Sequence, residues 1–222
     1  MIRLTPRPMC PTLPRSNRTD PRMRKEARSE NRPETRNQSP RLAPPPAAEA
    51  IRNLVERILC ELAKRREFLF VTLDPFDGGW SIHVQCHESD MGRILGTGGK
   101  RYDALLEVVK ALGVRAKLRM LLPRYQPPVT QPMGPSYMFE PAEAQDRVTR
   151  LVLDLLKALD DGTGTVGVTK AGIDLSFDLR TEEPELWELI LEHVSTIFKA
   201  IGFGTGLNLS LRVLPLEPEP TP

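Results

Sequence analysis

The sequence of 222 residues predicts an α+β fold made of two tandem copies of one unit, each in the order helix–strand–strand–helix–helix–strand. Two observations lead to this prediction. Segments with apolar residues at helical spacing alternate with short segments rich in β-branched and aromatic residues. In addition, the apolar positions of a helix predicted at 51–62 recur 97 residues later, at 148–159. Such a repeat indicates a duplicated unit.

The first copy, residues 48–123, opens with this helix, whose apolar residues are Ile51, Leu54, Val55, Ile58, Leu59 and Leu62. Two strands are predicted next, at 68–73 and 80–86, joined by a turn at 74–79 that contains proline and two glycines. Apolar and polar residues alternate in the second strand, which predicts one buried and one exposed face. Ser89 or Asp90 is expected to cap a short helix that runs to residue 95.

The most informative segment is the Gly-x-x-Gly turn Gly96-Thr97-Gly98-Gly99, which Lys100 and Arg101 follow. A helix is predicted from residue 100 to 112, closed by Gly113, and then a strand at 114–122. Glycine has no Cβ, so a ligand can approach the backbone closely. The first N–H groups of the following helix lack intrahelical partners and favour an anion. The segment therefore predicts a clamp for a sugar–phosphate backbone.

This segment and its neighbours resemble the type II KH domain of small bacterial RNA-binding proteins. The KH family clamps about four nucleotides of single-stranded nucleic acid with its Gly-x-x-Gly loop. Many KH loops carry Lys or Arg between the glycines, whereas this chain has Thr97 and Gly98. The resemblance implies phosphate contacts at the turn and an apolar groove for the bases beside it. The implied RNA-binding residues are Met91, Arg93, Ile94, Leu95, Gly96, Thr97, Gly98, Gly99, Lys100 and Arg101.

The second copy, residues 141–216, has the same predicted order but lacks the turn. Strands are predicted at 165–169, 173–179 and 207–215, with a long helix over 184–201 before the last of them. Where the first copy has its turn, the second has the acidic run 182–188, which would repel phosphate. We therefore expect a degenerate KH-like domain that does not bind RNA. It is expected either to hold a protein partner or a second subunit, or only to support the first domain.

Charge divides the chain more sharply than its net value of +2 suggests. Residues 1–47 carry 11 Lys and Arg against 4 Asp and Glu, while residues 125–222 carry 7 against 15. The segment 1–47 has almost no apolar periodicity, which predicts a disordered basic arm. It could bind RNA through phosphate charge, be a tail without a partner, or precede the true start of the protein. Residues 124–140 are predicted to be a Pro-rich linker, and residues 217–222 an acidic tail.

Several function classes are not expected. No Ser/His/acid or Cys/His set is evident, so an enzyme is not predicted, and neither is a cofactor. His83, Cys86 and His87 are close in sequence, but on a strand Cys86 faces away from both histidines, so no metal site is expected. No apolar segment is long enough to cross a membrane, and no secretory signal is expected. Three scattered cysteines indicate free thiols and a cytoplasmic location.

The sequence thus predicts a non-enzymatic protein that binds single-stranded RNA through the turn of its first KH domain. One alternative is a protein–protein adaptor that keeps the KH fold and binds nucleic acid weakly or not at all. Another is binding of single-stranded DNA, since no residue obviously reads a 2′-hydroxyl.

Overall fold

A computed structural model describes residues 43–122 and 141–216, which belong to one compact unit. The first half contains helices α1 (Pro46–Leu62), α2 (Glu88–Leu95) and α3 (Lys100–Arg115) and strands β1 (Phe70–Phe76), β2 (Gly79–Gln85) and β3 (Met120–Leu121). Two short 3₁₀ helices, η1 (Arg66–Phe68) and η2 (Thr97–Gly99), precede β1 and α3. The predicted arm up to residue 42, the linker 124–140 and the tail 217–222 lie outside the described residues.

The second half contains helices α4 (Pro141–Leu159) and α5 (Pro184–Thr205) and strands β4 (Thr165–Ala171), β5 (Asp174–Thr181) and β6 (Asn208–Pro215). The α+β class is therefore confirmed. The predicted helix order is wrong for this half, because the single helix α5 stands where the first half has α2, the turn and α3. Without glycines between residues 182 and 201, nothing interrupts the helix.

The two sheets have the same topology, with strand orders β1-β2-β3 and β4-β5-β6. In each sheet the first two strands form an antiparallel hairpin with a two-residue turn, Asp77–Gly78 or Gly172–Ile173. The third strand pairs in parallel with the second, as a strand must when a helix carries the chain back across the sheet. The pairing of Phe76 with Gly79 shows that residues 74–76, predicted as part of the turn, extend β1.

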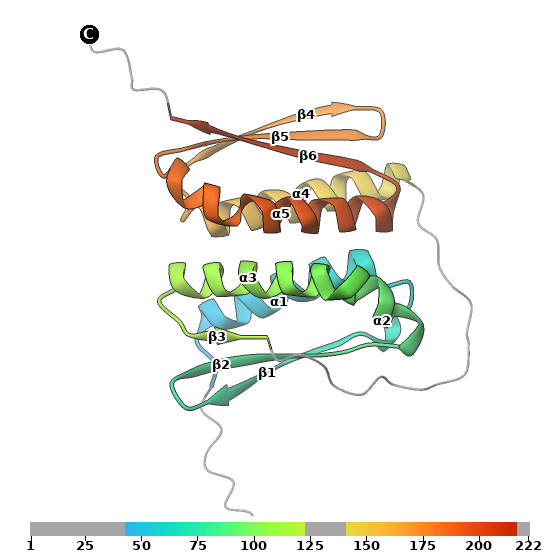
Figure 1. Ribbon diagram of the computed structural model, residues 1–222, viewed down its shortest axis with the longest axis vertical. Helices are drawn as coiled ribbons and strands as arrows, with labels where there is room; N and C mark the ends of the chain where they lie inside the picture. The colour runs from blue at the N-terminus through green and yellow to red at the C-terminus, as the bar shows by residue number, and fades with distance from the viewer. Residues whose placement is uncertain (1–42, 123–140, 217–222) are drawn as a thin grey trace, which may run out of the picture. The chain divides into compact units, whose positions relative to one another are not determined.

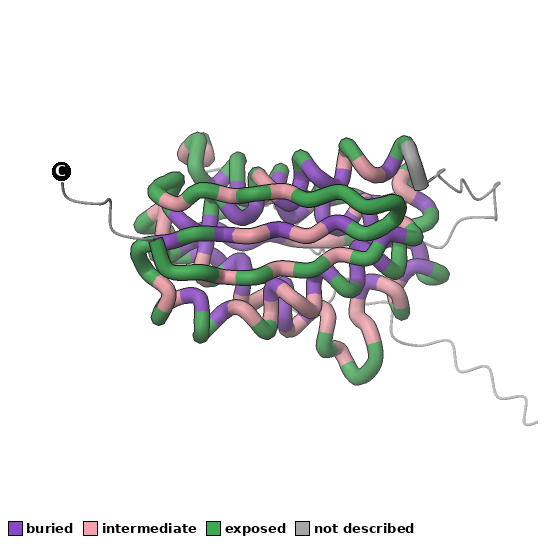
Figure 2. Tube along the Cα trace, turned by 90° about the horizontal axis from the view of Figure 1, so that it is seen from above, coloured by how far each residue is buried: buried purple, intermediate pink, exposed green. Residues whose placement is uncertain are grey.

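The helices lie between the two sheets (Figure 1). Leu175, Phe177 and Leu179 of β5 are completely buried, and the residues between them face outward. Figure 2 shows the outer face of this sheet, where the buried positions are concentrated on the central strand. The β4-β5-β6 sheet thus turns one apolar face toward the helices. In β2, where alternation was predicted, it is not regular, because Ser81 is buried together with Trp80 and Ile82.

The helices of the two halves pack against each other, α3 against α5 and α1 against both α4 and α5. The six repeated apolar positions of α1 and their six counterparts in α4 are all buried, and the core forms one cluster that spans both halves. Glu61 of α1 is 4% exposed and accepts hydrogen bonds from Arg147 of α4, at 2.6 and 3.0 Å, and from Arg66, at 3.1 Å. The described residues therefore fold around a shared helical layer.

The structure also repeats at the ends of α3 and α5. Gly113 and Gly202 are both buried in the last turns of their helices, and each carbonyl accepts a hydrogen bond from the N–H five residues later, that of Leu118 or Leu207. A Cβ at Gly113 or Gly202 would lie 2.8 or 2.4 Å from the carbonyl oxygen of the same partner. Glycine is required at both positions because a helix end and the following chain meet there.

Two sequence predictions about these helix ends are wrong. The strand predicted at 114–122 is mostly helix end and turn, since α3 runs to Arg115 and β3 contains only two residues. Lys117, at φ 54°, ends the helix in the left-handed conformation. The helix predicted over 184–201 continues to Thr205, and only Gly206, at φ 74°, leaves the helix.

Candidate nucleic-acid interface

The glycine turn lies between α2 and α3, as predicted, and three of its four residues have positive φ angles. Gly96, Gly98 and Gly99 have φ angles of 72°, 62° and 81°, in the region that L side chains rarely adopt. Thr97 and Gly98 are exposed, and a Cβ at Gly98 would meet no atom within 4 Å. The two middle residues of the turn are therefore accessible to a ligand.

The start of α3 faces this turn. Gly99 occupies the N-cap in the left-handed conformation and, as a glycine, has no side chain with which to cap the helix. Lys100, the first residue of α3, is exposed. The N–H groups of Gly99 and Lys100 donate to the carbonyl oxygens of Gly96 and Thr97, and the Lys100 side chain lies at the positive end of a 16-residue helix. Asp103, in the first turn, contributes an opposing negative charge that the sequence-based prediction did not include.

The short helix α2 is fixed from two sides. His87, and neither of the predicted residues, is its N-cap, and its Nδ1 accepts a hydrogen bond from the Ser89 N–H at 3.1 Å. Asp90 is 1% exposed and accepts hydrogen bonds from the backbone N–H groups of Lys64 and Arg65 at 3.0 and 2.8 Å. Asp90 thus attaches α2 to the segment that follows α1 and positions the turn.

The three predicted apolar residues of the groove differ in accessibility. Ile94 is 3% exposed and belongs to the core. Met91 and Leu95 are half-buried and pack against the core with part of each side chain accessible. Only Met91 and Leu95 of the three therefore present an apolar surface next to the turn.

The two predicted arginines are held by the protein itself. Arg93 Nε donates to the Leu62 carbonyl at 2.9 Å, and Arg101 Nη1 donates to the Arg93 carbonyl at 2.8 Å. Their guanidinium carbons lie 5.6 and 5.5 Å from the ring centroid of Phe203, on α5. The sequence-based prediction did not include Phe203 in the site, because it follows the turn by about a hundred residues and belongs to the other half.

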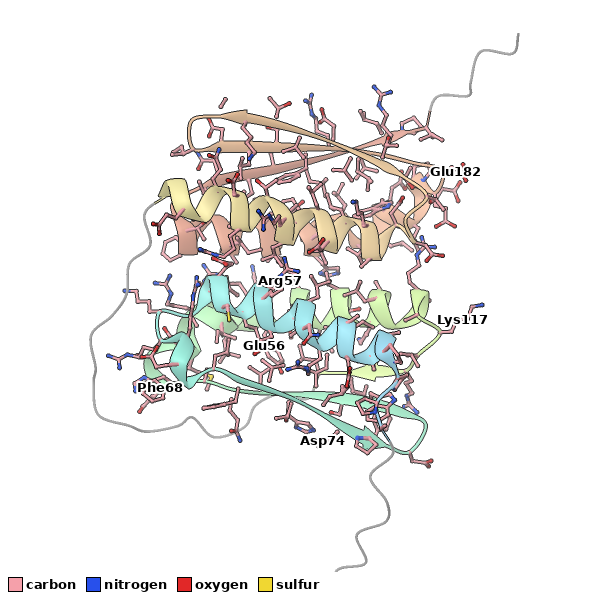
Figure 3. The ribbon with its side chains drawn as sticks, turned by 180° about the vertical axis from the view of Figure 1, so that it is seen from behind. Glu56, Arg57, Phe68, Asp74, Lys117 and Glu182 are labelled. Atoms are coloured by element: carbon pink, nitrogen blue, oxygen red, sulfur yellow. The ribbon has the colours of Figure 1, made fainter. Side chains whose placement is uncertain are left out.

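The start of α5 is the counterpart of the glycine turn and has the opposite charge. Glu182, Glu183 and Glu185 are exposed there and line a hollow of about 730 Å³ together with Val114, Arg115 and Lys117. Figure 3 shows Lys117 and Glu182 at the same end of the molecule. Arg115 forms an ion pair with Glu183 and donates to the Leu159 carbonyl at 3.0 Å. Three carboxylates at this end favour cations over phosphate.

Within residues 43–122 and 141–216, no group of three His, Cys, Asp or Glu side chains is arranged to hold a metal ion. None of the helices in that part of the chain has the length and apolar character needed to cross a bilayer. Cys60 and Cys86 are free thiols, and burial raises the pKa of both.

Comparison of the chain with protein-family models, with curated proteins and with solved structures found no match.

Proposed function

We propose that the protein binds single-stranded RNA at the turn formed by Gly96, Thr97, Gly98 and Gly99, and that it has no enzymatic activity. In this proposal residues 48–123 are a type II KH domain, and the second half is a KH-like copy that has lost the turn. The observation that carries the proposal is the exposed glycine turn at the positive end of α3. Such a backbone can approach phosphate oxygens closely, and the helix end favours an anion.

The arrangement around the turn supports this proposal. The first half follows the order helix, strand, strand, helix, turn, helix, strand, and its third strand pairs in parallel with the second. Lys100 would add charge to the backbone contacts, and Met91 and Leu95 would contact bases next to the turn. Arg93 and Arg101 are fixed by carbonyl groups, so their charge would act at the edge of the site. The unpaired cysteines agree with a cytoplasmic location.

The basic segment before the structured unit would add affinity without sequence preference. Its excess of arginine would neutralise further phosphates and release counterions, so affinity should depend steeply on salt. A plot of log affinity against log salt has a negative slope. Removing residues 1–42 should make this slope shallower by about 0.7 for each phosphate that is no longer neutralised.

A pair of matched double variants tests the proposal in the full chain. Thr97→Asp with Gly98→Asp places two carboxylates where phosphate would lie, whereas Thr97→Ser with Gly98→Asn keeps a similar shape without charge. Asn and Asp are the non-glycine residues best tolerated at positive φ, so both variants should fold. Fluorescence anisotropy with a random-sequence RNA of about ten nucleotides, longer than a KH loop clamps, should show that the Asp variant loses most of its affinity and keeps only the salt-sensitive binding of the basic segment. The Ser/Asn variant should keep most of the wild-type affinity.

Other outcomes identify the alternatives. Equal affinity for RNA and for DNA of the same length would indicate a binder of single strands in general. Equal RNA affinity in the wild type and the Asp variant would exclude the turn as the site. If the wild type and both double variants all fail to bind RNA, the remaining candidate function is that of a protein–protein adaptor.

A further inference from the structure

Phe203 is an exposed aromatic residue that the other half of the molecule brings to the glycine turn. It lies in the last turn of α5, and 69% of its surface is exposed. Arg101, the second residue after the turn, has its guanidinium carbon 5.5 Å from the Phe203 ring centroid. One side chain therefore separates the ring from the turn.

The packing of the two halves fixes this position. A Cβ at Gly204, the residue after Phe203, would lie 2.1 Å from the carbonyl oxygen of Glu61, so the end of α5 touches the backbone of α1. Arg93 binds the carbonyl of Leu62, the next residue of α1, and also lies against the Phe203 ring. The ring, both arginines and the end of α1 therefore form one cluster beside the turn.

The equivalent position in the first half shows that this cluster is not a general property of the repeat. Val114 follows Gly113 as Phe203 follows Gly202, and it is 76% exposed beside the acidic start of α5. Both positions face the start of a helix from the other half. Phe203 faces the glycine turn and two arginines, whereas Val114 faces three glutamates. The aromatic ring is thus present at the end that carries the turn.

An exposed ring next to two cations has a chemistry that suits nucleobases. Guanidinium groups within about 6 Å of an aromatic centroid are attracted to the ring face. Bases that are not paired stack on phenylalanine rings and on arginine planes in proteins that bind single strands. Much of Phe203 remains open for such a contact, since 69% of its surface is exposed.

We propose that Phe203, with Arg93 and Arg101, stacks a base of the RNA strand whose backbone binds at Gly96–Gly99. The second half would then complete the binding surface of the first rather than only support it. This inference rests on the proposed function of the turn. The base would belong to a nucleotide next to those that the turn clamps, because Arg101 separates the ring from the glycines.

The length of the RNA tests this inference. Phe203→Leu removes the ring but keeps an apolar side chain in the helix, Phe203→Tyr keeps the ring, and Val114→Ala alters the equivalent position as a control. Affinities of the full chain should be measured for random-sequence RNAs of about four nucleotides, the length that a KH loop clamps, and about ten, together with thermal unfolding. Phe203→Leu should weaken binding of the longer RNA roughly five- to a hundredfold, the range for loss of one stacked base. Binding of the shorter RNA should be unchanged, and the Tyr and Val114 variants should behave as wild type.

Each other result overturns the inference in a different way. If Phe203→Leu binds the longer RNA as the wild type does, the ring does not contact RNA, and the turn can still be the site. If Phe203→Leu weakens both lengths equally, the residue acts only through the packing of the two halves. If the wild type binds neither RNA, the proposed function fails together with this inference.

Discussion

Arg57 of α1 donates a hydrogen bond of 2.6 Å to Asp154 of α4, although the two residues occupy equivalent positions of a repeated helix, 97 residues apart. Figure 3 shows Arg57 at the layer where the two helix pairs meet. Equivalent positions touch each other in this way in a self-complementary interface, close to its two-fold axis. The contacts of α3 with α5 and of α1 with α4 fit the same arrangement. The two copies therefore pack like the subunits of a dimer.

The interface is not fully symmetric. The contact between Glu61 and Arg147 would have its symmetric counterpart at positions 50 and 158, where both residues are alanine. The buried carboxylate of Glu61 and its two arginines thus occur on one side of the helical layer only, the side where Phe203 approaches Arg93.

Replacing Arg147 should destabilise the whole unit. Arg147→Met leaves the buried Glu61 carboxylate with Arg66 as its remaining cation, and loss of one partner from a buried ion pair costs about 3 kcal/mol. Arg57→Met, at the exposed pair in the same interface, should cost less than about 1 kcal/mol. Urea unfolding of both variants measures the difference. Equal losses would show that the Glu61 contact is not a principal support of the interface.

Two glycine-to-alanine substitutions should change the stability of the protein in opposite directions. Gly204→Ala forces a methyl group against the Glu61 carbonyl, and overpacking of this kind costs about 1–3 kcal/mol. Gly92→Ala, in α2, meets nothing within 4 Å and should stabilise the protein by about 0.5–1 kcal/mol, because alanine loses less backbone entropy in a helix. Thermal unfolding reports both effects. A neutral Gly204→Ala would contradict the close approach of α5 to α1.

The two halves should fold together rather than independently. Separation would expose the apolar faces that the α1/α3 and α4/α5 pairs bury against each other. Fragments 43–131 and 132–216 should each show reduced helix content and bind a hydrophobic dye, and mixing them should restore helix content. Circular dichroism of the separate and mixed fragments tests this. A fully helical, monomeric fragment with no dye binding would show that one half is stable alone.

Alkaline pH should weaken the fold through Cys86. Burial, and then the charge of Asp90, raise the pKa of this thiol to about 11. The native protein therefore keeps a proton that the unfolded chain releases above about pH 9, so this stabilisation is complete below pH 9 and is lost as pH rises toward 11. Between about pH 8 and 10 the free energy of unfolding should fall by roughly 1 kcal/mol more in the wild type than in Cys86→Ala. If the free energy of unfolding falls with pH equally in the wild type and in Cys86→Ala, the raised pKa of Cys86 is refuted.

Local patterns were enough to predict most elements. Helical spacing located α1 and α4, and glycine in the turn predicted the break between α2 and α3. Lys117 shows where this fails, because a lysine at positive φ that ends a helix has no sequence signature. The last turn of α5 was missed for a related reason, since glycines 202 and 204 stand there for packing against Leu207 and Glu61, and that packing is tertiary.

In the candidate site, too, local sequence predicted some features, while others depend on tertiary packing. The turn follows from four adjacent residues and could be predicted, as could the exposed Lys100. The contacts of Arg93 and Arg101 with the Phe203 ring depend on how α5 approaches from the other half. The sequence pattern of residues 48–123 could not predict that Phe203, on α5, lies next to the turn. The packing of α5 against α3 and α1, which joins distant parts of the chain, brings it to the turn.

The covalent connection between the two halves changes how their interface responds to dilution. Two separate subunits dissociate on dilution, whereas halves joined by residues 123–140 meet at an effective concentration that dilution cannot lower. A homodimer would also carry two identical turns and two identical counterpart surfaces. In the single chain the two ends differ, because one has glycines and arginines and the other has glutamates. Each chain therefore carries one such turn and one acidic counterpart, in a ratio fixed by the sequence rather than by mass action.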